Sequence, residues 1–224
     1  MCWKIIQFVI IKTILKLDAS DTLHEFIFVD EAGFNLTKRR QRGCNIIGQR
    51  TLVDVSGQHE GNVTLCAAIS NHGLLHHHAT LGPYNTQRLL TFLDGLWKAL
   101  FQHVQRELQP CYVVVWDNVH FHHSVLVRNW FMNDPRFTNV FLTPYSPFLS
   151  SIEEFFSAWR WKVYDRNPYV QNNLLQAMEE ACGDIAVESC QGCLRHSRAF
   201  FPRCLARENI VSNVDENLWP DPGR

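Results

Sequence analysis

The sequence has little charge: charged residues make up 19% of its 224 residues, and the formal net charge is −1 at pH 7. A chain with this balance is not a polycation, so any contact with nucleic acid must come from local basic patches or from metal ions. Glycine and proline are also few, with 11 and 9 residues, which excludes collagen-like and low-complexity linker proteins. Hydrophobic residues reach 46%, which is enough to build a full core. The composition therefore indicates a globular protein with about one domain plus extensions.

Two kinds of segment are missing as well. No uninterrupted run of about 20 apolar residues occurs, so the sequence predicts no membrane span. No Gly-x-x-x-x-Gly-Lys motif occurs, which argues against a common nucleotide-binding loop. The apolar residues 1–17 have some features of a signal peptide, but Lys12 and Lys16 interrupt the run and no clean cleavage site follows. We interpret this segment as an amphipathic helix or an exon remnant, and residues 1–24 as an appendage outside the core.

The 8 cysteines are scattered through the chain, and a chain of this length does not need disulfides to fold. We therefore expect most of them to be reduced, buried thiols. Cys190, Cys193 and His196 could also be interpreted as a zinc site. Their spacing is not that of a familiar zinc finger, and the segment has helical periodicity, so we prefer ordinary core or surface cysteines.

The hydrophobic pattern predicts strands first and then alternating strands and helices. Residues 26–29 form a continuous β-type run, and further strands predicted at 51–55, 63–69 and 73–80 complete an antiparallel meander. Helical spacing then begins at 85–105, with Asn85 or Thr86 as the N-cap. The later segments are predicted to form a strand, a helix, a short strand and three helices, at 112–116, 123–132, 140–142, 152–163, 170–187 and 191–207. This order predicts an α/β or α+β domain at residues 25–207, followed by a C-terminal tail at 208–224.

Two of the apolar strands end in an aspartate, Asp30 and Asp117. A carboxylate at the end of a buried strand is costly to desolvate unless it is paired, hydrogen-bonded or bound to a cation. Glu153 lies in the first turn of a predicted helix, where the helix dipole favours a negative charge. If the three converge, they form an all-oxygen site suited to Mg²⁺ or Mn²⁺. Taken singly, each is explained as well by a turn cap or an ordinary acidic helix start, so periodicity does not join them.

The local sequence around these acids is more specific. The blocks are Phe28-Val29-Asp30-Glu31-Ala32-Gly33-Phe34, Val115-Trp116-Asp117-Asn118-Val119-His120, and the stretch 143–154 that reads TPYSPFLSSIEE. In order and in spacing, with 35 residues between Asp117 and Glu153, they resemble the catalytic blocks of DDE transposases of the Tc/mariner superfamily. The resemblance extends over about residues 25–207, and the third block with its spacing is its most specific part.

This resemblance implies an RNase H-like α/β fold, in which a mixed central sheet with an N-terminal antiparallel meander is flanked by helices. It implies a catalytic triad of Asp30, Asp117 and Glu153 that holds two Mg²⁺ or Mn²⁺ ions. In the family, these metals support DNA cleavage at transposon ends and strand transfer to target DNA. Glu154 is the substitute ligand if the register is shifted by one residue. Other implied site residues are Asn118, His120 and His122 beside the triad, where a histidine could steady a phosphate, and a DNA-contacting basic loop of Lys38, Arg39, Arg40 and Arg42.

The implied partner is DNA, with a homodimer by analogy with the family, no membrane, and a nuclear location. The chain also departs from the family pattern. Phe148 replaces an Asp, Ser150-Ser151 replaces Asn-Pro, and residues 1–24 are too short for the helix-turn-helix modules that read transposon ends. Two functions therefore stay open. The favoured one is a metal-dependent DNA endonuclease and transposase; the alternative is a domesticated or decayed DNA-binding or regulatory protein that no longer cuts.

Overall fold

A five-stranded sheet forms the centre of the computed structural model, which describes residues 3–34, 63–101, 110–143, 146–166 and 171–210. The strand order is β3-β2-β1-β4-β5, with bounds His24–Phe34 for β1, Val63–Ser70 for β2, Gly73–Leu81 for β3, Cys111–Trp116 for β4 and Phe137–Phe141 for β5. The first three strands are an antiparallel meander, whereas β4 runs parallel to both β1 and β5. The mixed sheet with its N-terminal meander is confirmed. The strand predicted at 51–55 lies outside the described residues.

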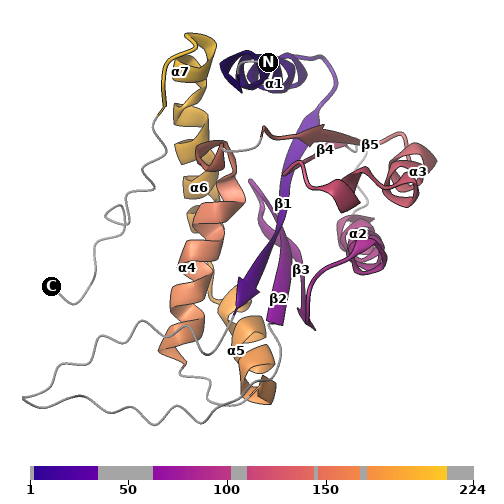
Figure 1. Cartoon of the computed structure of the whole chain (residues 1–224), viewed down its shortest axis with the longest axis vertical. Coiled ribbons are helices and arrows are strands. Elements are labelled where there is room, and N and C mark those ends of the chain that lie inside the picture. The colour runs from indigo at the N-terminus through magenta and orange to yellow at the C-terminus, as the bar shows by residue number, and fades with distance from the viewer. Residues whose placement is uncertain (1–2, 35–62, 102–109, 144–145, 167–170, 211–224) are drawn as a thin grey trace, which may run out of the picture.

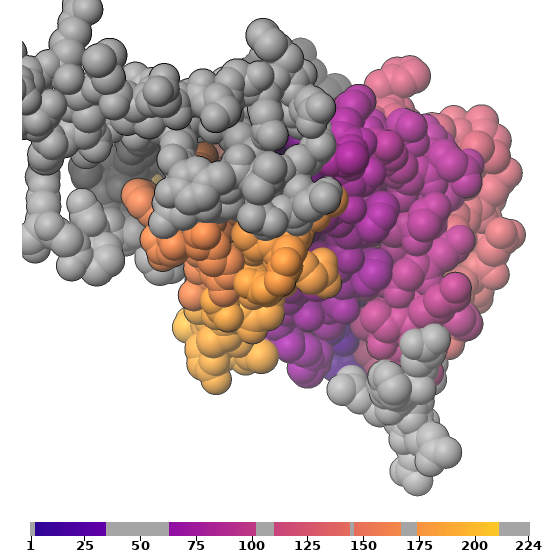
Figure 2. Space-filling model, turned by 90° about the horizontal axis from the view of Figure 1, so that it is seen from below, coloured from indigo at the N-terminus to yellow at the C-terminus, as the bar shows by residue number. Residues whose placement is uncertain are grey.

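Helices cover both faces of this sheet (Figure 1). On one face lie α2 (Thr86–Phe101) and α3 (Val125–Asn133). On the other lie α4 (Ser151–Asp165), α5 (Gln171–Gly183) and α6 (Val187–Ala199). At one end of the molecule, α1 (Trp3–Asp18) lies beside the short α7 (Phe201–Leu205). Seen from below in Figure 2, the C-terminal helices in orange to yellow adjoin the purple segment that holds β2, β3 and α2.

Helix α2 illustrates how the sequence pattern becomes structure. Its buried side chains recur every three or four residues and form one stripe: Leu89, Phe92, Leu93, Leu96 and Leu100. The Asn85 side chain accepts a hydrogen bond from the backbone N–H of Arg88 at 3.0 Å, so the predicted N-cap is confirmed. At the C-terminal end of the chain, the helix predicted at 191–207 is instead divided into α6 and α7. Pro202 explains the division, because proline is tolerated in the first turn of a helix and not in its interior.

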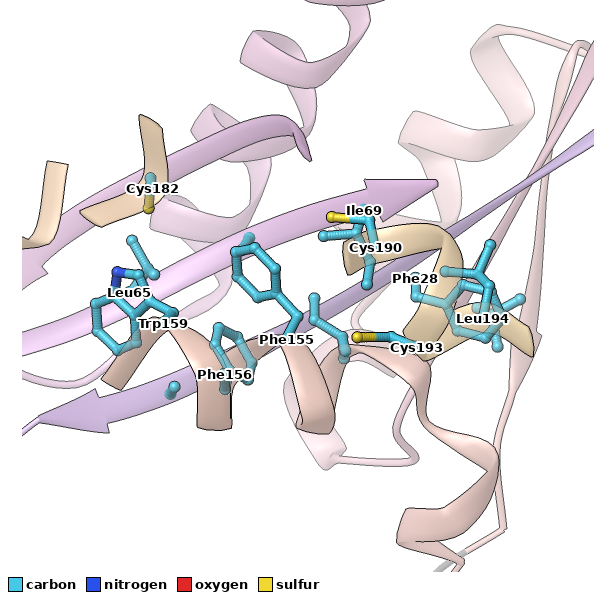
Figure 3. Packing of buried hydrophobic residues seen from close by; sticks show 14 of the residues in the cluster. Phe28, Leu65, Ile69, Phe155, Phe156, Trp159, Cys182, Cys190, Cys193 and Leu194 are labelled. Carbon is cyan, nitrogen blue, oxygen red and sulfur yellow. The ribbon is translucent and has the colours of Figure 1, made fainter. Parts of the chain in front are cut away.

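The core consists of two clusters, one on each face of the sheet. Alternate residues of β1 divide between them: Phe26 and Phe28 face α4, whereas Ile27 and Val29 face α2. Figure 3 shows part of the larger cluster, in which Phe155, Phe156 and Trp159 of α4 meet side chains of β2 and α6. Cys190 and Cys193 lie in this cluster as free thiols, as expected for core cysteines.

Helix α1 contributes to the same cluster, because Ile10, Ile11 and Ile14 are buried in it. Arg198 of α6 also forms a salt bridge to Asp18 at the end of α1, at 2.6 Å. The domain boundary at residue 24 stays a prediction, but the helix before it shares the main core. Within the described residues, none of the helices combines the length and apolar character that crossing a bilayer requires.

Candidate active site

The sheet brings the two strand-end aspartates together. The parallel pairing of β1 with β4 places Phe28 opposite Val115, and the same register continued by two residues places Asp30 opposite Asp117. Glu153 comes to this edge from the first turn of α4, which packs against β1. The charges of Asp117 and Glu153 both act on Asp30, and the charge of Asp117 also acts on Glu153. Three segments that are distant in sequence thus place their carboxylates in one electrostatic neighbourhood.

These carboxylates disfavour one another's charged forms. Burial raises the pKa of Asp30 from 3.8 to about 8, and the negative charges of Glu31, Glu153 and Asp117 add to the rise. The backbone N–H of Glu31 opposes this rise in pKa by donating a hydrogen bond to Oδ1 of Asp30 at 2.7 Å. Burial also raises the pKa of Glu153; Arg160, two turns further along α4, opposes this rise, and Asp117 adds to it. The cluster therefore carries more negative charge than its surroundings compensate.

The chemistry of the cluster fits a divalent cation. The Oδ1 atom of Asp117 is buried and has no hydrogen-bond donor. The nearest ring nitrogen, Nδ1 of His122 at 3.0 Å, makes its hydrogen bond to the Asp117 carbonyl instead, at 3.2 Å. Desolvated carboxylate oxygens without donors are the hard ligands that Mg²⁺ and Mn²⁺ prefer. In the part of the chain that the structure describes, however, no three His, Cys, Asp or Glu side chains already stand close enough to hold one ion.

His122 lies beneath this edge, in a 3₁₀ turn at His120–His123. Its side chain is 0% exposed and stacks on Trp116, with ring centroids 4.5 Å apart and planes at 14°. Its Nε2 lies 3.4 Å from Oε1 of Glu31. Burial alone lowers the pKa of His122, but the flanking carboxylates of Asp117 and Glu31 outweigh it and raise the pKa to about 9. A buried histidine in this conformation has no surface with which to contact a phosphate directly.

The structure does not group the other described residues that were predicted for the site with the three acids. Glu154 points away from the aspartates, and its Oε1 lies 3.3 Å from Nε2 of His196 on α6. Asn118 pairs with His123, and His120 is exposed at the start of the 3₁₀ turn. The predicted basic loop of Lys38, Arg39, Arg40 and Arg42 lies outside the described residues.

Two residues near the cluster were not singled out by the sequence analysis. Glu31 follows Asp30 on β1 and therefore points to the opposite face of the sheet, towards His122. Arg160 lies seven residues after Glu153 and hence on the same side of α4. Strand alternation and helical periodicity, applied from Asp30 and Glu153, are signals that could have found both.

Comparisons with known proteins identify the family of the chain and its fold. The sequence matches the DDE superfamily endonuclease family over residues 25–174. The catalytic domain of Mos1 mariner transposase has a similar structure, with a TM-score of 0.66 and 14% identity over 92% of this chain and 94% of that chain. The same domain with Raltegravir and Mg gives a TM-score of 0.69 at 14% identity, again covering 92% of this chain and 94% of that one.

The Mos1 strand transfer complex is also similar, with a TM-score of 0.69 and 14% identity over 92% of this chain. The match covers only 61% of that transposase, so this chain spans about three fifths of it. No curated protein matches the sequence significantly. At these identities the solved structures establish the fold, which is the RNase H-like fold that the resemblance implied. Since the family match extends over well more than half of the sequence, the chain belongs to the DDE superfamily endonucleases.

Proposed function

We propose that this chain is a transposase-type DNA endonuclease domain that depends on divalent metal and uses Asp30, Asp117 and Glu153 as its catalytic carboxylates. The observation that supports the proposal is that these three acids, from β1, the end of β4 and the start of α4, act on one another electrostatically without enough compensating positive charge. Their distribution over three segments is difficult to explain as turn capping. Family membership supplies the reaction class, which is phosphodiester cleavage.

Asp30, Asp117 and Glu153 would hold Mg²⁺ or Mn²⁺, and we propose two ions. When bound, such ions activate a water nucleophile and stabilise the attacking and leaving oxygens of phosphoryl transfer. The chain itself supplies the oxygen ligands, among which Oδ1 of Asp117 is buried and accepts no hydrogen bond. It also supplies mutual repulsion among the acids, which a cation would relieve. Without a cation, the same negative charge repels a DNA phosphate, so we expect productive DNA binding at this edge only together with metal.

DNA is the proposed partner of this chain. Support comes from the similar Mos1 structures, one of which is a paired-end complex with the left transposon end. Arg160 is placed to compensate phosphate charge next to Glu153. The basic loop at Lys38, Arg39, Arg40 and Arg42 stays the predicted DNA contact. The homodimer and the nuclear location likewise stay predictions.

Plasmid nicking by the full purified chain in Mn²⁺ tests this function. We expect nicking by the native chain, loss of nicking to background with Asp117→Ala, and unchanged nicking with Asp21→Ala. This control removes an exposed charge that precedes the first residue of β1, at the opposite end of that strand from Asp30. Nicking that survives Asp117→Ala would contradict the proposed role of Asp117. A folded native protein that neither nicks DNA nor binds Mn²⁺ by calorimetry would favour the alternative, a DNA-binding or regulatory protein without cleavage activity.

A further inference from the structure

We propose that Glu31 and His122 are positioning residues that hold the Asp117 carboxylate at the candidate active site. The inference deepens the proposed function. Its prediction about metal affinity rests on that function, whereas its prediction about the position of Asp117 does not. Asp117 needs such support because it lies just past the end of β4, where the ladder hydrogen bonds that fix a strand have stopped. Its side chain is 42% exposed, so packing alone leaves it free to rotate.

His122 contacts Asp117 at two points. Its Nδ1 lies 3.2 Å from the main-chain oxygen and 3.0 Å from Oδ1 of the side chain. On the other side of the ring, Nε2 lies 3.4 Å from Oε1 of Glu31. Carbonyl and carboxylate oxygens accept hydrogen bonds and do not donate them, so the ring serves as the donor in both directions. One imidazole thus joins the carboxylate at the end of β4 to a carboxylate in the middle of the sheet.

The ring itself is held firmly. It stacks on Trp116, and the edge of Phe121 meets it with ring centroids 4.4 Å apart. With a side chain that is 0% exposed, His122 has no solvent to replace a lost partner. Rotation of the imidazole would therefore break several contacts at once, and this rigidity is what a positioning residue requires.

Glu31 anchors this arrangement to the sheet. It pairs across the ladder with Cys66 of β2, and the Cys66 thiol donates to Oε1 at a sulfur–oxygen distance of 3.9 Å. Its side chain is only 13% exposed. Strand alternation directs it to the face opposite Asp30, where it meets His122. Glu31 is therefore placed to act through His122, while Asp30 faces the cluster itself.

Residues that orient metal ligands from behind typically account for a tenfold to hundredfold difference in metal affinity. We therefore expect Glu31→Ala to weaken Mn²⁺ binding by roughly that factor in calorimetry of the full chain. Glu31→Gln keeps an oxygen acceptor at the same reach and should restore most of the affinity. Glu25→Ala is the matched control, because Glu25 lies on the same strand, is similarly buried at 12% exposure, and accepts a hydrogen bond from Ser70 at 2.9 Å.

A second measurement needs no metal. In crystal structures of the metal-free variants, we expect the Asp117 carboxylate to leave His122 in Glu31→Ala and to stay there in Glu31→Gln and Glu25→Ala. An Asp117 that keeps its place in Glu31→Ala would overturn the inference, as would equal Mn²⁺ affinity of Glu31→Ala and the native chain. If the native chain binds no Mn²⁺, the proposed function fails, and the position of Asp117 in these structures still decides whether Glu31 positions it.

Discussion

Glu153 and Glu154 are neighbours at the start of α4, but their carboxylates face different parts of the molecule. Glu153 is in electrostatic contact with Asp117, whereas Glu154 lies 3.3 Å from the imidazole of His196 on α6. Successive residues of a helix point about 100° apart, so only one of the pair can face the end of β4. The pairing of Glu154 with His196 leaves Glu153 as the acid at the candidate site.

The buried charge of Asp30 should make the metal-free protein less stable at high pH. Between pH 3.8 and about 8 the folded state retains a proton that the unfolded state has lost, so stability falls as the pH rises through this range. We expect Asp30→Asn to be more stable than the native chain by roughly 1–3 kcal/mol at pH 9 with a chelator, and similar to it near pH 3. Urea unfolding at both pH values measures the difference. A variant that is less stable at pH 9 would show that the Asp30 charge is well compensated.

Helix α1 should contribute to stability as a core element. Ile11 of α1 is completely buried in the main cluster. Ile11→Ala should therefore lower the free energy of unfolding by about 2–5 kcal/mol. Ile5 on the same helix is 45% exposed, and Ile5→Ala is the control, with an expected change within about 0.5 kcal/mol. Urea titration of the full chain measures both. Equal effects of the two changes would mean that α1 does not pack on the core.

Gly95 of α2 should resist substitution because of His76 on β3. A Cβ atom at residue 95 would clash with Nε2 of His76, whose ring also packs against Phe92. Despite the better helix propensity of alanine, we expect Gly95→Ala to destabilise the fold by about 1–2 kcal/mol. Thermal unfolding of Gly95→Ala alone and combined with His76→Ala tests the cause, since the second change should remove most of the clash. Gly183→Ala, with no neighbour within 4 Å, should cost nothing.

The buried hydroxyl pair of Ser151 and Ser197 should show strong coupling. Their oxygens lie 2.6 Å apart between α4 and α6, and both residues are buried. Removing one hydroxyl leaves the other without this partner, at an expected cost of about 1–2 kcal/mol, whereas removing both should cost little more than one. A double-mutant cycle with Ser151→Ala and Ser197→Ala measures the coupling free energy. Strictly additive effects would argue against a hydrogen bond between the helices.

Much of the fold was predictable because its signals are local. Apolar runs at 26–29 and 112–116 lie within β1 and β4, and the 3–4 residue spacing after Asn85 gives α2. The division of α6 from α7 was missed, although Pro202 was visible, because the apolar periodicity continues across it. The order of the strands in the sheet could not be predicted from such local signals. The central place of β1, between β2 and β4, depends on pairings between distant segments that local periodicity does not contain.

The candidate site also has features that the sequence predicts and features that it does not. The positions of Asp30, Asp117 and Glu153 in the chain follow from the sequence blocks, and the structure adds that their charges act on one another. The surroundings of His122 were not predictable, because its burial depends on stacking against Trp116 and on reaching Glu31 across the sheet. A histidine that follows a strand-end aspartate by five residues is compatible with either an exposed or a buried side chain, and only tertiary packing decides.

The parallel pairing of β1 with β4 has a consequence for biosynthesis. It joins residues 24–28 to residues 111–115, and the third acid arrives only with α4. Pairings of such long range close late, because the entropy of the intervening loop must be lost first. A nascent chain on the ribosome therefore holds its three acids apart until α4 has emerged, so a site that needs all three cannot form before then.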